Sequence, residues 1–322
     1  MFKTGKSSLK RDDGFQVEAY APVIISASIV TDIPAYHSDW FIERIKAGYA
    51  VRTNVFSHKK MFVSFQNARL VVFWTKNAAP IMSKLHDLDD RSLGYFFHFT
   101  LNDYEREGLE PGLPSLESRV EIFQQLASLI GKEKVIWRFD PLVLTDQISP
   151  ERLVEKIEAV AERLQGYTEK VVFKFAEIER HRKVAKRMTK EGWRYRDFSQ
   201  DEVCYVASEI ARIGKRFGME ARTCMDGHDL TILGIHPNRC VDPDLIRRVF
   251  GHDADLLKFV DKCSGKNGLS PLKNCNCLPH TDIGEYNTCL HFCRYCYANF
   301  SDRVIQENFK SRLSGNGESM LK

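Results

Sequence analysis

The sequence lacks cysteine before Cys204, lacks long apolar runs and has almost no net charge. Its apolar runs fall short of the roughly 20 residues that a membrane helix needs, which excludes a membrane-spanning protein. The first twenty residues carry acidic side chains and no apolar core, so they predict neither a secretory signal nor a transit peptide. A net charge of +4 over 322 residues is too small to indicate nucleic-acid binding by itself. We therefore expect a cytoplasmic protein without a membrane partner.

Cysteine is concentrated in the last third of the chain. There are nine cysteines, and five of them lie between Cys275 and Cys296. Because the count is odd and no export signal is predicted, disulfides are not expected, and dense cysteines of this kind indicate metal or redox ligands. The sequence thus predicts a metal centre near the C-terminus.

The first two thirds alternate between short apolar runs and amphipathic patterns. The runs predict strands, and the amphipathic stretches predict helices between them. No glycine-rich dinucleotide-binding turn follows the first strand, so the alternation favours an α/β fold of the complete or partial (β/α) barrel type. An open, doubly wound sheet remains the alternative. The expected strands are 22–28, 69–75, 95–101, 134–139, 170–175 and 219–224, and the expected helices are 37–49, 120–130, 150–164, 201–217 and 242–250.

The domain organisation follows from this pattern. Residues 1–20 are expected to form a flexible tail, and residues 21–225 to form the barrel. Residues 226–300 form a cysteine-rich segment in which the periodic pattern weakens. No linker separates this segment from the barrel, so we expect it to pack on the barrel and supply a cluster-binding loop. Residues 301–322 are expected to be a C-terminal tail.

Cys289, Cys293 and Cys296 have the spacing C-x3-C-x2-C, with Tyr295 directly before the last cysteine. A four-iron cluster normally takes four thiolates, so three cysteines in one loop hold three irons and leave one iron open to a small-molecule chelate. Structural zinc usually draws on paired cysteine hooks from two places in the chain. The loop therefore favours iron–sulfur over zinc.

This loop, with Tyr297 directly after Cys296, resembles the signature of radical S-adenosylmethionine enzymes. The resemblance implies a [4Fe-4S] cluster on the three cysteines, with its open iron chelated by the amino and carboxylate groups of S-adenosylmethionine. One electron from a donor would then cleave the sulfonium and release a 5′-deoxyadenosyl radical. The chain as a whole is similar to an uncharacterised bacterial family, DUF1848, over about residues 22–300. The matching stretches are VIISAS, TDIPAY, VVFWTKN, WRFDP, DIGEYNTC and CRYCYAN.

Two departures from these families bear on the interpretation. In most radical S-adenosylmethionine enzymes the cysteine loop follows the first barrel strand, whereas here it lies near the C-terminus. Because a barrel closes on itself, we expect the loop to reach the same place, as in a circular permutation. The matching DUF1848 segment has two arginines where this chain has Ile29 and Val30, which leaves the identity of the substrate open.

A second set of cysteines comprises Cys224, Cys240, Cys275 and Cys277. Four thiolates suffice for an auxiliary iron–sulfur cluster or an all-cysteine zinc site. Two cysteines separated by one residue are closer than a standard zinc hook, which favours the cluster. Of the other two cysteines, Cys204 is expected to be a buried thiol on an apolar helix stripe, and Cys263 could replace any of the four.

Several polar residues lie at or just after predicted strand ends, where barrel enzymes build their sites. Lys76 and Asn77 are predicted to contact cofactor or substrate, with a capping asparagine and a solvated lysine as the alternative. Arg138 and Asp140 form either a structural ion pair or a ligand contact. The further cofactor-binding candidates are Ser28, which otherwise caps a helix, Glu177, as an acceptor for the amino group of S-adenosylmethionine, and Tyr295.

Residues 180–196 carry the one basic cluster, with Trp193 and Tyr195 interleaved. The cluster predicts either a solvated helix face or a phosphate-backbone contact. The leading hypothesis is a radical S-adenosylmethionine enzyme with an unknown substrate. The alternative is an iron–sulfur or zinc protein in which the metal is structural and the basic helix binds nucleic acid, and a photolyase-like DNA-repair role lies between the two.

Overall fold

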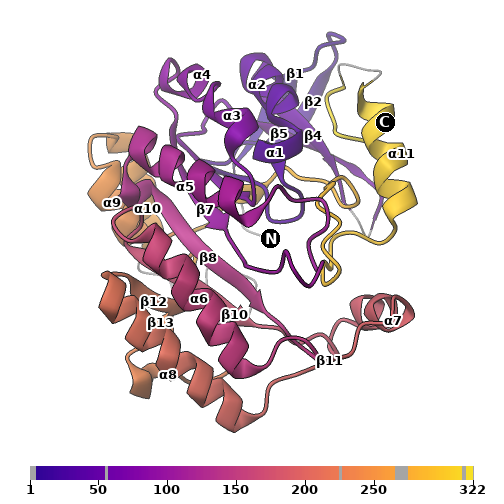
Figure 1. The fold of residues 1–322 in the computed structure, drawn as a ribbon. Coiled ribbons are helices and arrows are strands. Elements are labelled where there is room, and N and C mark those ends of the chain that lie inside the picture. The colour runs from indigo at the N-terminus through magenta and orange to yellow at the C-terminus, as the bar shows by residue number, and fades with distance from the viewer. Residues whose placement is uncertain (1–4, 55–56, 225–226, 265–274, 314–316, 322) are drawn as a thin grey trace.

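The computed structural model describes residues 5–54, 57–224, 227–264, 275–313 and 317–321. Its centre is an eight-stranded sheet in which all neighbouring strands run parallel (Figure 1). The spatial order is β13 (His236–Pro237), β12 (Glu220–Thr223), β10 (Lys170–Phe175), β8 (Val135–Leu142), β7 (Gly94–Thr100), β6 (Leu70–Thr75), β3 (Ile24–Ala27) and β14 (Thr281–Asp282). From β3 to β13 the spatial order follows the order along the chain, and β14 is added beside β3 at one edge of the sheet. The predicted α/β class is confirmed.

Helices cover the outer face of the sheet. Side chains that alternate along the strands, such as Val71, Phe73 and Phe97, are fully buried and belong to the larger of two apolar clusters. Figure 1 shows α5, α6 and α8 lying side by side along this face. The covering helices are α1 (Ile33–Tyr36), α2 (Ser38–Ala47), α3 (Ala79–Met82), α4 (His86–Asp89), α5 (Leu116–Ile130), α6 (Pro150–Leu164) and α8 (Gln200–Phe217).

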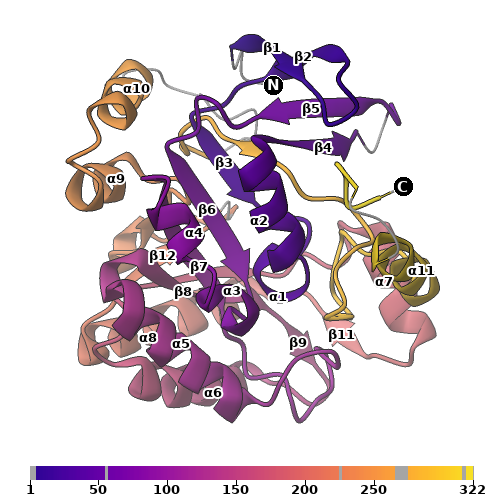
Figure 2. The same cartoon turned by 90° about the horizontal axis from the view of Figure 1, so that it is seen from above.

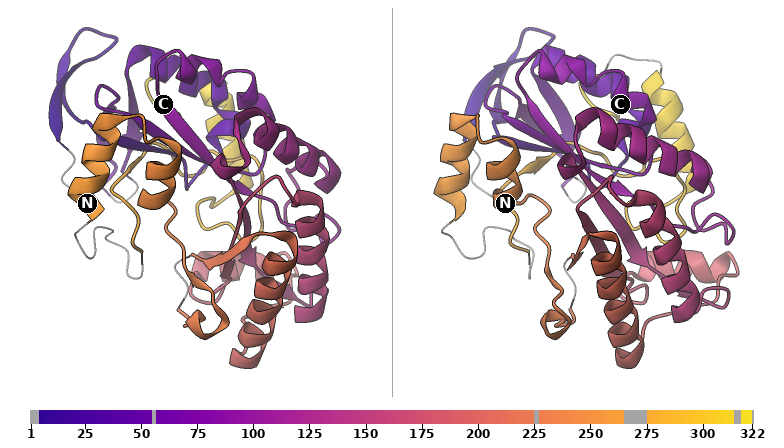
Figure 3. Two further views of the ribbon diagram at one scale, coloured as in Figure 1. Left: turned by 90° about the vertical axis from the view of Figure 1, so that its left-hand side faces the viewer. Right: turned by 60° about the vertical axis from the view of Figure 1, so that its left-hand side comes forward.

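The other face of the sheet is apolar at its amino-terminal end and polar at its carboxyl-terminal end. Helices α9 (Pro243–Val249) and α10 (Ala254–Ser264) lie on the opposite side of the sheet from α5, α6 and α8 (Figure 3). They pack with Leu70, Val72 and Phe96 in the smaller apolar cluster. The same alternation places Trp74, His98 and Arg138 nearer the carboxyl ends of the strands. The polar side chains of this face therefore gather at the carboxyl ends of the strands.

Residues 6–20, expected as part of a flexible tail, form a hairpin. Strands β1 (Lys6–Lys10) and β2 (Gln16–Tyr20) join β5 (Lys60–Ser64) and β4 (Tyr49–Thr53) in a small sheet at the rim of the molecule (Figure 2). Alternating side chains of β1 are exposed, so its apolar content is too low to predict a strand from the sequence. Arg11 holds this hairpin to the C-terminal segment through two hydrogen bonds of 3.1 and 2.7 Å to Glu318.

The C-terminal residues also differ from a tail, because α11 (Asp302–Leu313) is helical. Two further expectations are corrected. Strand β8 does not stop at Pro141 but continues to Leu142, which pairs with Phe175 across a register shift. Cys204 is exposed rather than buried, since it lies on the solvent side of α8.

The remaining elements are short. They are α7 (Arg182–Lys190), β9 (Leu144–Thr145), β11 (Tyr195–Arg196) and the 3-10 turns Lys132–Lys134 and Thr231–Leu233. Helix α7 is thus shorter than the basic stretch 180–196. In the part of the chain that the structure describes, no helix has the length and apolarity to cross a membrane.

Candidate functional site

The three-cysteine loop lies over the carboxyl ends of three neighbouring strands. It contacts residues that follow β3, β6 and β7, and it reaches this position because β14 pairs with β3 immediately before the loop begins. In Figures 1 and 2 the C-terminal segment passes between α1 and α7. The carboxyl ends of parallel strands are where α/β proteins bind their ligands.

Of the three cysteines of the loop, Cys293 is buried, and Cys289 and Cys296 are half-buried. Burial raises the pKa of Cys289 to about 12, and the negative charges of Asp32 and Cys296 add to this effect. Burial also raises the pKa of Cys293 well above its usual value, against the opposing charge of Lys76. Cys296 and Cys289 raise the pKa of Cys293 further, which places the three sulfurs within electrostatic range of one another. A shared positive centre would relieve this repulsion.

A buried ion pair supports the loop from below. Lys76 Nζ lies 2.7 Å from Glu110 Oε1 and donates to the Tyr295 hydroxyl at 3.2 Å. The Tyr295 hydroxyl in turn donates to Glu110. Burial opposes the charged forms of both Lys76 and Glu110. The charge of Glu110 nevertheless raises the pKa of Lys76, and the charge of Lys76 lowers the pKa of Glu110, so the pair stays ionised. Asn102 closes the network with hydrogen bonds of 3.1 Å to both Glu110 and Tyr295.

Asp32 fixes the beginning of the loop. Its carboxylate caps α1 by accepting from the Ala35 amide at 3.0 Å, and it accepts from Thr75 Oγ1 at 2.8 Å and the Lys76 amide at 2.7 Å. The ring nitrogen Nε2 of His291 lies 2.7 Å from the same carboxylate. Because His291 stands between two of the cysteines, Asp32 ties the loop to the ends of β3 and β6.

Arg187 of α7 braces the other side of the loop, and sequence reasoning missed this role. Its guanidinium donates to the carbonyls of Arg294 at 2.6 Å, Cys296 at 2.7 Å and Asn299 at 2.6 Å. Five donors in a fixed fork suit several carbonyls of one turn. In the sequence this arginine is one of several in a basic stretch, and only its half-buried place on α7, about one turn after the exposed Lys183, distinguishes it.

A further group of hydrogen bonds lies at the end of β3. Ser28 Oγ donates to Asp282 Oδ1 at 2.7 Å, and the amides of Ile29 and Gly284 donate to the same carboxylate at 2.8 Å each. Ile29 is 44% exposed, and its carbonyl accepts from the Tyr297 hydroxyl at 3.3 Å. Ile29, one of the two positions at which the similar family segment has arginine, therefore borders the cysteine loop.

The structure brings some predicted site residues to the loop and leaves others away from it. Arg138 and Asp140 form an ion pair of 2.5 Å, and Asp140 is linked to the loop through Asn102, whose Oδ1 accepts from its amide at 2.9 Å. Asn77 lies nearby, but its side chain accepts from the Ala79 amide at the start of α3, as a capping residue does. Glu177 is exposed and pairs with Arg180 at 3.0 Å, and none of its described contacts reaches the loop.

The second set of cysteines also comes together. Cys224 and Cys240 have their sulfurs 3.5 Å apart, and Cys277 Sγ accepts from the Cys240 amide at 3.1 Å. Cys275 shares a side-chain hydrogen bond with Cys277. Within the described ranges, however, no three histidine, cysteine or carboxylate side chains are already arranged to hold one metal ion.

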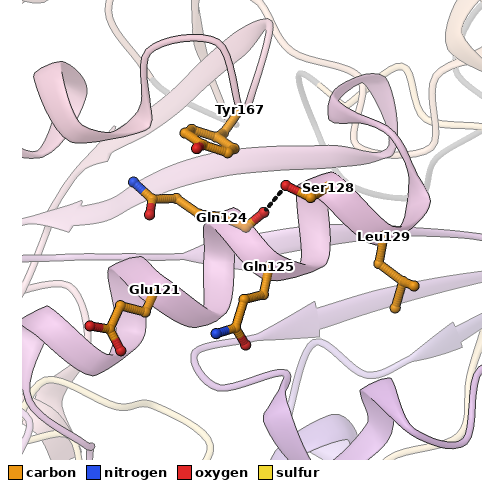
Figure 4. A pocket seen from close by; sticks show the side chains of 6 residues that line it. All are labelled: Glu121, Gln124, Gln125, Ser128, Leu129 and Tyr167. Carbon is orange, nitrogen blue, oxygen red and sulfur yellow. Dashed lines mark hydrogen bonds between the residues drawn. The ribbon is translucent and has the colours of Figure 1, made fainter.

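The surface also has a shallow depression on the far side of α5, with a volume of about 540 Å³. Figure 4 shows its lining, in which Gln124 and Tyr167 lie near each other and the Ser128 hydroxyl donates to the Gln124 carbonyl at 2.8 Å. Its side chains come from α5 and from Tyr167, which lies three residues beyond the end of α6, on the outer face of the sheet. It is therefore separate from the cysteine loop.

Comparison with known proteins gives a family match and a weak structural similarity. The family profile described as "Domain of unknown function (DUF1848)" matches residues 24–298. No curated protein sequence matches the chain. Among solved structures, a protein described as an alpha-L-fucosidase candidate from Bacteroides thetaiotaomicron is similar with 10% identity and a TM-score of 0.25, covering 82% of this chain and 93% of that chain. A similarity at this level supports no conclusion about fold or function.

Proposed function

We propose that this chain, which belongs to the DUF1848 family, is an iron–sulfur enzyme of the radical S-adenosylmethionine type. The observation that carries the proposal is the position of the loop with Cys289, Cys293 and Cys296. These three thiols, of which Cys293 is buried and the other two are half-buried, lie over the carboxyl ends of the parallel strands, where a barrel of the radical S-adenosylmethionine kind would hold its cluster.

The residues present fit such a cluster. The loop supplies three thiolates rather than four, so one iron of a four-iron cluster would remain open for the amino and carboxylate groups of S-adenosylmethionine. Lys76, which faces Cys293 closely enough to lower the pKa of its thiol, supplies positive charge beside the thiolates. When bound and reduced, such a cluster supplies the electron that cleaves the sulfonium bond.

The protein's own groups would orient the cofactor and exclude water. Partial burial raises the pKa of the Tyr297 phenol, and the negative charges of Cys296 and Asp140 raise it further. Both groups therefore lie near this phenol. The Asp140 side chain keeps 22% of its surface exposed, so an acidic group faces the open side of the loop. We assign it, with Asp282 behind Ser28, to the cationic part of S-adenosylmethionine. Arg187 holds the loop backbone so that the three sulfurs keep their positions.

Electron paramagnetic resonance on the reduced, anaerobically reconstituted protein tests this assignment. We expect S-adenosylmethionine to change the spectrum of the cluster, because the cofactor binds its open iron. Cys293→Ala should lose this cluster, whereas Cys204→Ala, at an exposed cysteine on α8, should retain both the cluster and the spectral change. A wild-type spectrum that S-adenosylmethionine leaves unchanged, or a protein that takes up zinc and never iron, would contradict the proposal.

No observation favours the nucleic-acid alternative. Three of the five arginines in residues 180–196 have partners within the protein: Arg187 binds loop carbonyls, Arg180 pairs with Glu177 and Arg196 pairs with Glu202. Lys183 lies 4.2 Å from the centre of the Phe300 ring. Binding through residues 180–196 remains a prediction without structural support.

A further inference from the structure

Two cysteine side chains at the ends of neighbouring strands touch each other. Cys224 follows β12 and Cys240 follows β13, and these two strands pair in parallel at one edge of the sheet. The Sγ atoms of the two residues lie 3.5 Å apart and share a hydrogen bond. A disulfide bond is about 2.05 Å long, so the two sulfurs need to approach by only about 1.5 Å to form one.

The donors around Cys240 favour a reactive thiolate. Arg138 Nη1 donates to Cys240 Sγ at 3.4 Å, and Asn238 Nδ2 donates to the same sulfur at 3.5 Å. Both donors belong to buried side chains. A cation and an amide that point at one sulfur stabilise its anion, and the thiolate is the form of cysteine that attacks disulfides. Cys240 is thus the nucleophile of the pair.

The pair differs from the two other cysteines nearby in its exposure to solvent. Cys224 and Cys240 are half-buried, whereas Cys275 and Cys277 are buried. Cys277 lies behind the pair, where its sulfur accepts from the Cys240 amide at 3.1 Å. A partly exposed thiolate with a second thiol beside it is the arrangement of redox-active cysteines, because the second thiol can displace whatever the first one binds.

We infer that Cys224 and Cys240 are a redox-active dithiol, which a low-molecular-weight disulfide such as oxidised glutathione converts to an intramolecular disulfide. The Cys240 thiolate attacks one sulfur of oxidised glutathione, forms a mixed disulfide and releases one glutathione thiolate. The Cys224 thiol passes its proton to this thiolate and then attacks Cys240 Sγ. The second glutathione leaves as a thiolate and takes a proton from water. The two protein sulfurs are thereby oxidised to one disulfide, and one oxidised glutathione is reduced to two glutathione molecules.

Oxidation changes the charge beside Arg138. In the dithiol state the guanidinium faces both the Cys240 thiolate and Asp140, to which its Nε donates at 3.2 Å. A disulfide carries no charge, so Cys240 no longer competes with Asp140 for the guanidinium. The Asp140 amide in turn donates to Asn102, in the network below the first loop. The redox state of the pair is thus sensed by a residue that contacts this network, although the thiol exchange itself requires neither a metal nor S-adenosylmethionine.

Peptide mapping under non-reducing conditions tests the inference. The wild-type protein is reduced, freed of reductant, exposed to oxidised glutathione, alkylated with iodoacetamide and digested with trypsin. Trypsin cuts after Arg239 and so separates Cys224 from Cys240. We expect mass spectrometry to find the two peptides linked, and dithiothreitol to separate them.

Three variants define the role of each thiol. Cys224→Ser should lose the link and keep glutathione on Cys240, because the mixed disulfide is no longer resolved. Cys240→Ser should also lose the link, and it should bind at least tenfold less glutathione at Cys224, because the donors point at Cys240. Cys204→Ser is the matched control: Cys204 is exposed on α8, so its replacement should leave the link unchanged.

The wild-type result decides the inference, and circular dichroism shows whether the serine variants are folded. Wild-type protein in which Cys224 and Cys240 stay reduced while the exposed Cys204 takes up glutathione would overturn it. A link from Cys240 to Cys277, or zinc or iron that stays on these thiols and protects them, would overturn it as well. Since S-adenosylmethionine takes no part in the measurement, failure of the function proposed for the first loop would leave the result unchanged.

Discussion

Single side chains bind the C-terminal loop to a sheet whose strands lie up to 260 residues earlier in the chain. Asp32 and Arg187 each make several hydrogen bonds to the loop or to its supports. Hydrogen bonds to a charged group contribute about 1.5–3 kcal/mol each, more than neutral ones, because the ion polarises its partner. The position of the loop thus depends on a few side chains, and replacing any one of them should weaken the attachment of the loop.

Arg187→Ala should destabilise the protein by about 2–4 kcal/mol, because several loop carbonyls lose their donor at once. Urea unfolding followed by circular dichroism measures the change in the free energy of unfolding. Lys186→Ala, at the exposed neighbour on the same helix, should change it by less than about 0.5 kcal/mol. Equal effects of the two substitutions would mean that Arg187 is not a brace.

Gly284→Ala should also be destabilising, because a Cβ at this position would collide with Ser28 Oγ and Cβ. Relieving the collision would break the hydrogen bonds that join Ser28 and Gly284 to Asp282, at a cost of about 1–3 kcal/mol. Thermal unfolding measures this, with Gly227→Ala as the control, since a Cβ there meets nothing within 4 Å. If both variants melted at the wild-type temperature, the close packing of Gly284 on Ser28 would be refuted.

At the scale of elements, helix α8 shows how local sequence determines where an element begins. Ser199 and Glu202 form a capping box, in which the Ser199 amide donates to Glu202 Oε2 at 2.9 Å. Arg196 adds an ion pair to the same carboxylate. The Arg196 side chain and the Ser199 amide lower the pKa of Glu202 to about 2. The start of this helix is therefore sensitive to acid.

Glu202→Gln should destabilise the protein by about 1 kcal/mol at pH 7, a modest value because solvent screens the pair. Because the pKa of Glu202 is lower in the folded protein, its carboxylate stabilises the fold fully at pH values above the unfolded pKa of 4.5. This contribution is lost as the pH falls towards the folded pKa of about 2. The difference between variant and wild type, measured by urea unfolding, should shrink over this range. Glu209→Gln on the same helix is the control, and a difference that does not change with pH would contradict the account.

Buried strands could be predicted from the sequence, but pairings between distant residues could not. Strand β10 occupies Lys170–Phe175 as expected. A strand of a parallel sheet is covered on both faces, so it is recognisable in the sequence as a nearly continuous apolar run. Strand β14 has two residues, too few for any periodicity, and it exists because Thr281 pairs with Ile25. The brace by Arg187 was missed for the same reason, because its partners lie more than 100 residues later in the chain.

At the scale of the whole molecule, the parallel sheet brings two sets of cysteines to the carboxyl ends of its strands. The first lies over the carboxyl ends of β3, β6 and β7, and the second spans the edges formed by β13 and the segment before β14. The Arg138–Asp140 pair stands between them. Strand β14 pairs with β3, so the segment from the end of the chain lies beside this early strand.

The formation of 5′-deoxyadenosine tests the central claim most directly. Anaerobically reconstituted protein is reduced with dithionite in the presence of S-adenosylmethionine, and the product is measured by chromatography and mass spectrometry. We predict that the wild type and Cys204→Ala release 5′-deoxyadenosine, and that Cys293→Ala releases at least a hundredfold less. A wild-type protein with a full complement of iron and sulfide that releases no more 5′-deoxyadenosine than Cys293→Ala would contradict the account.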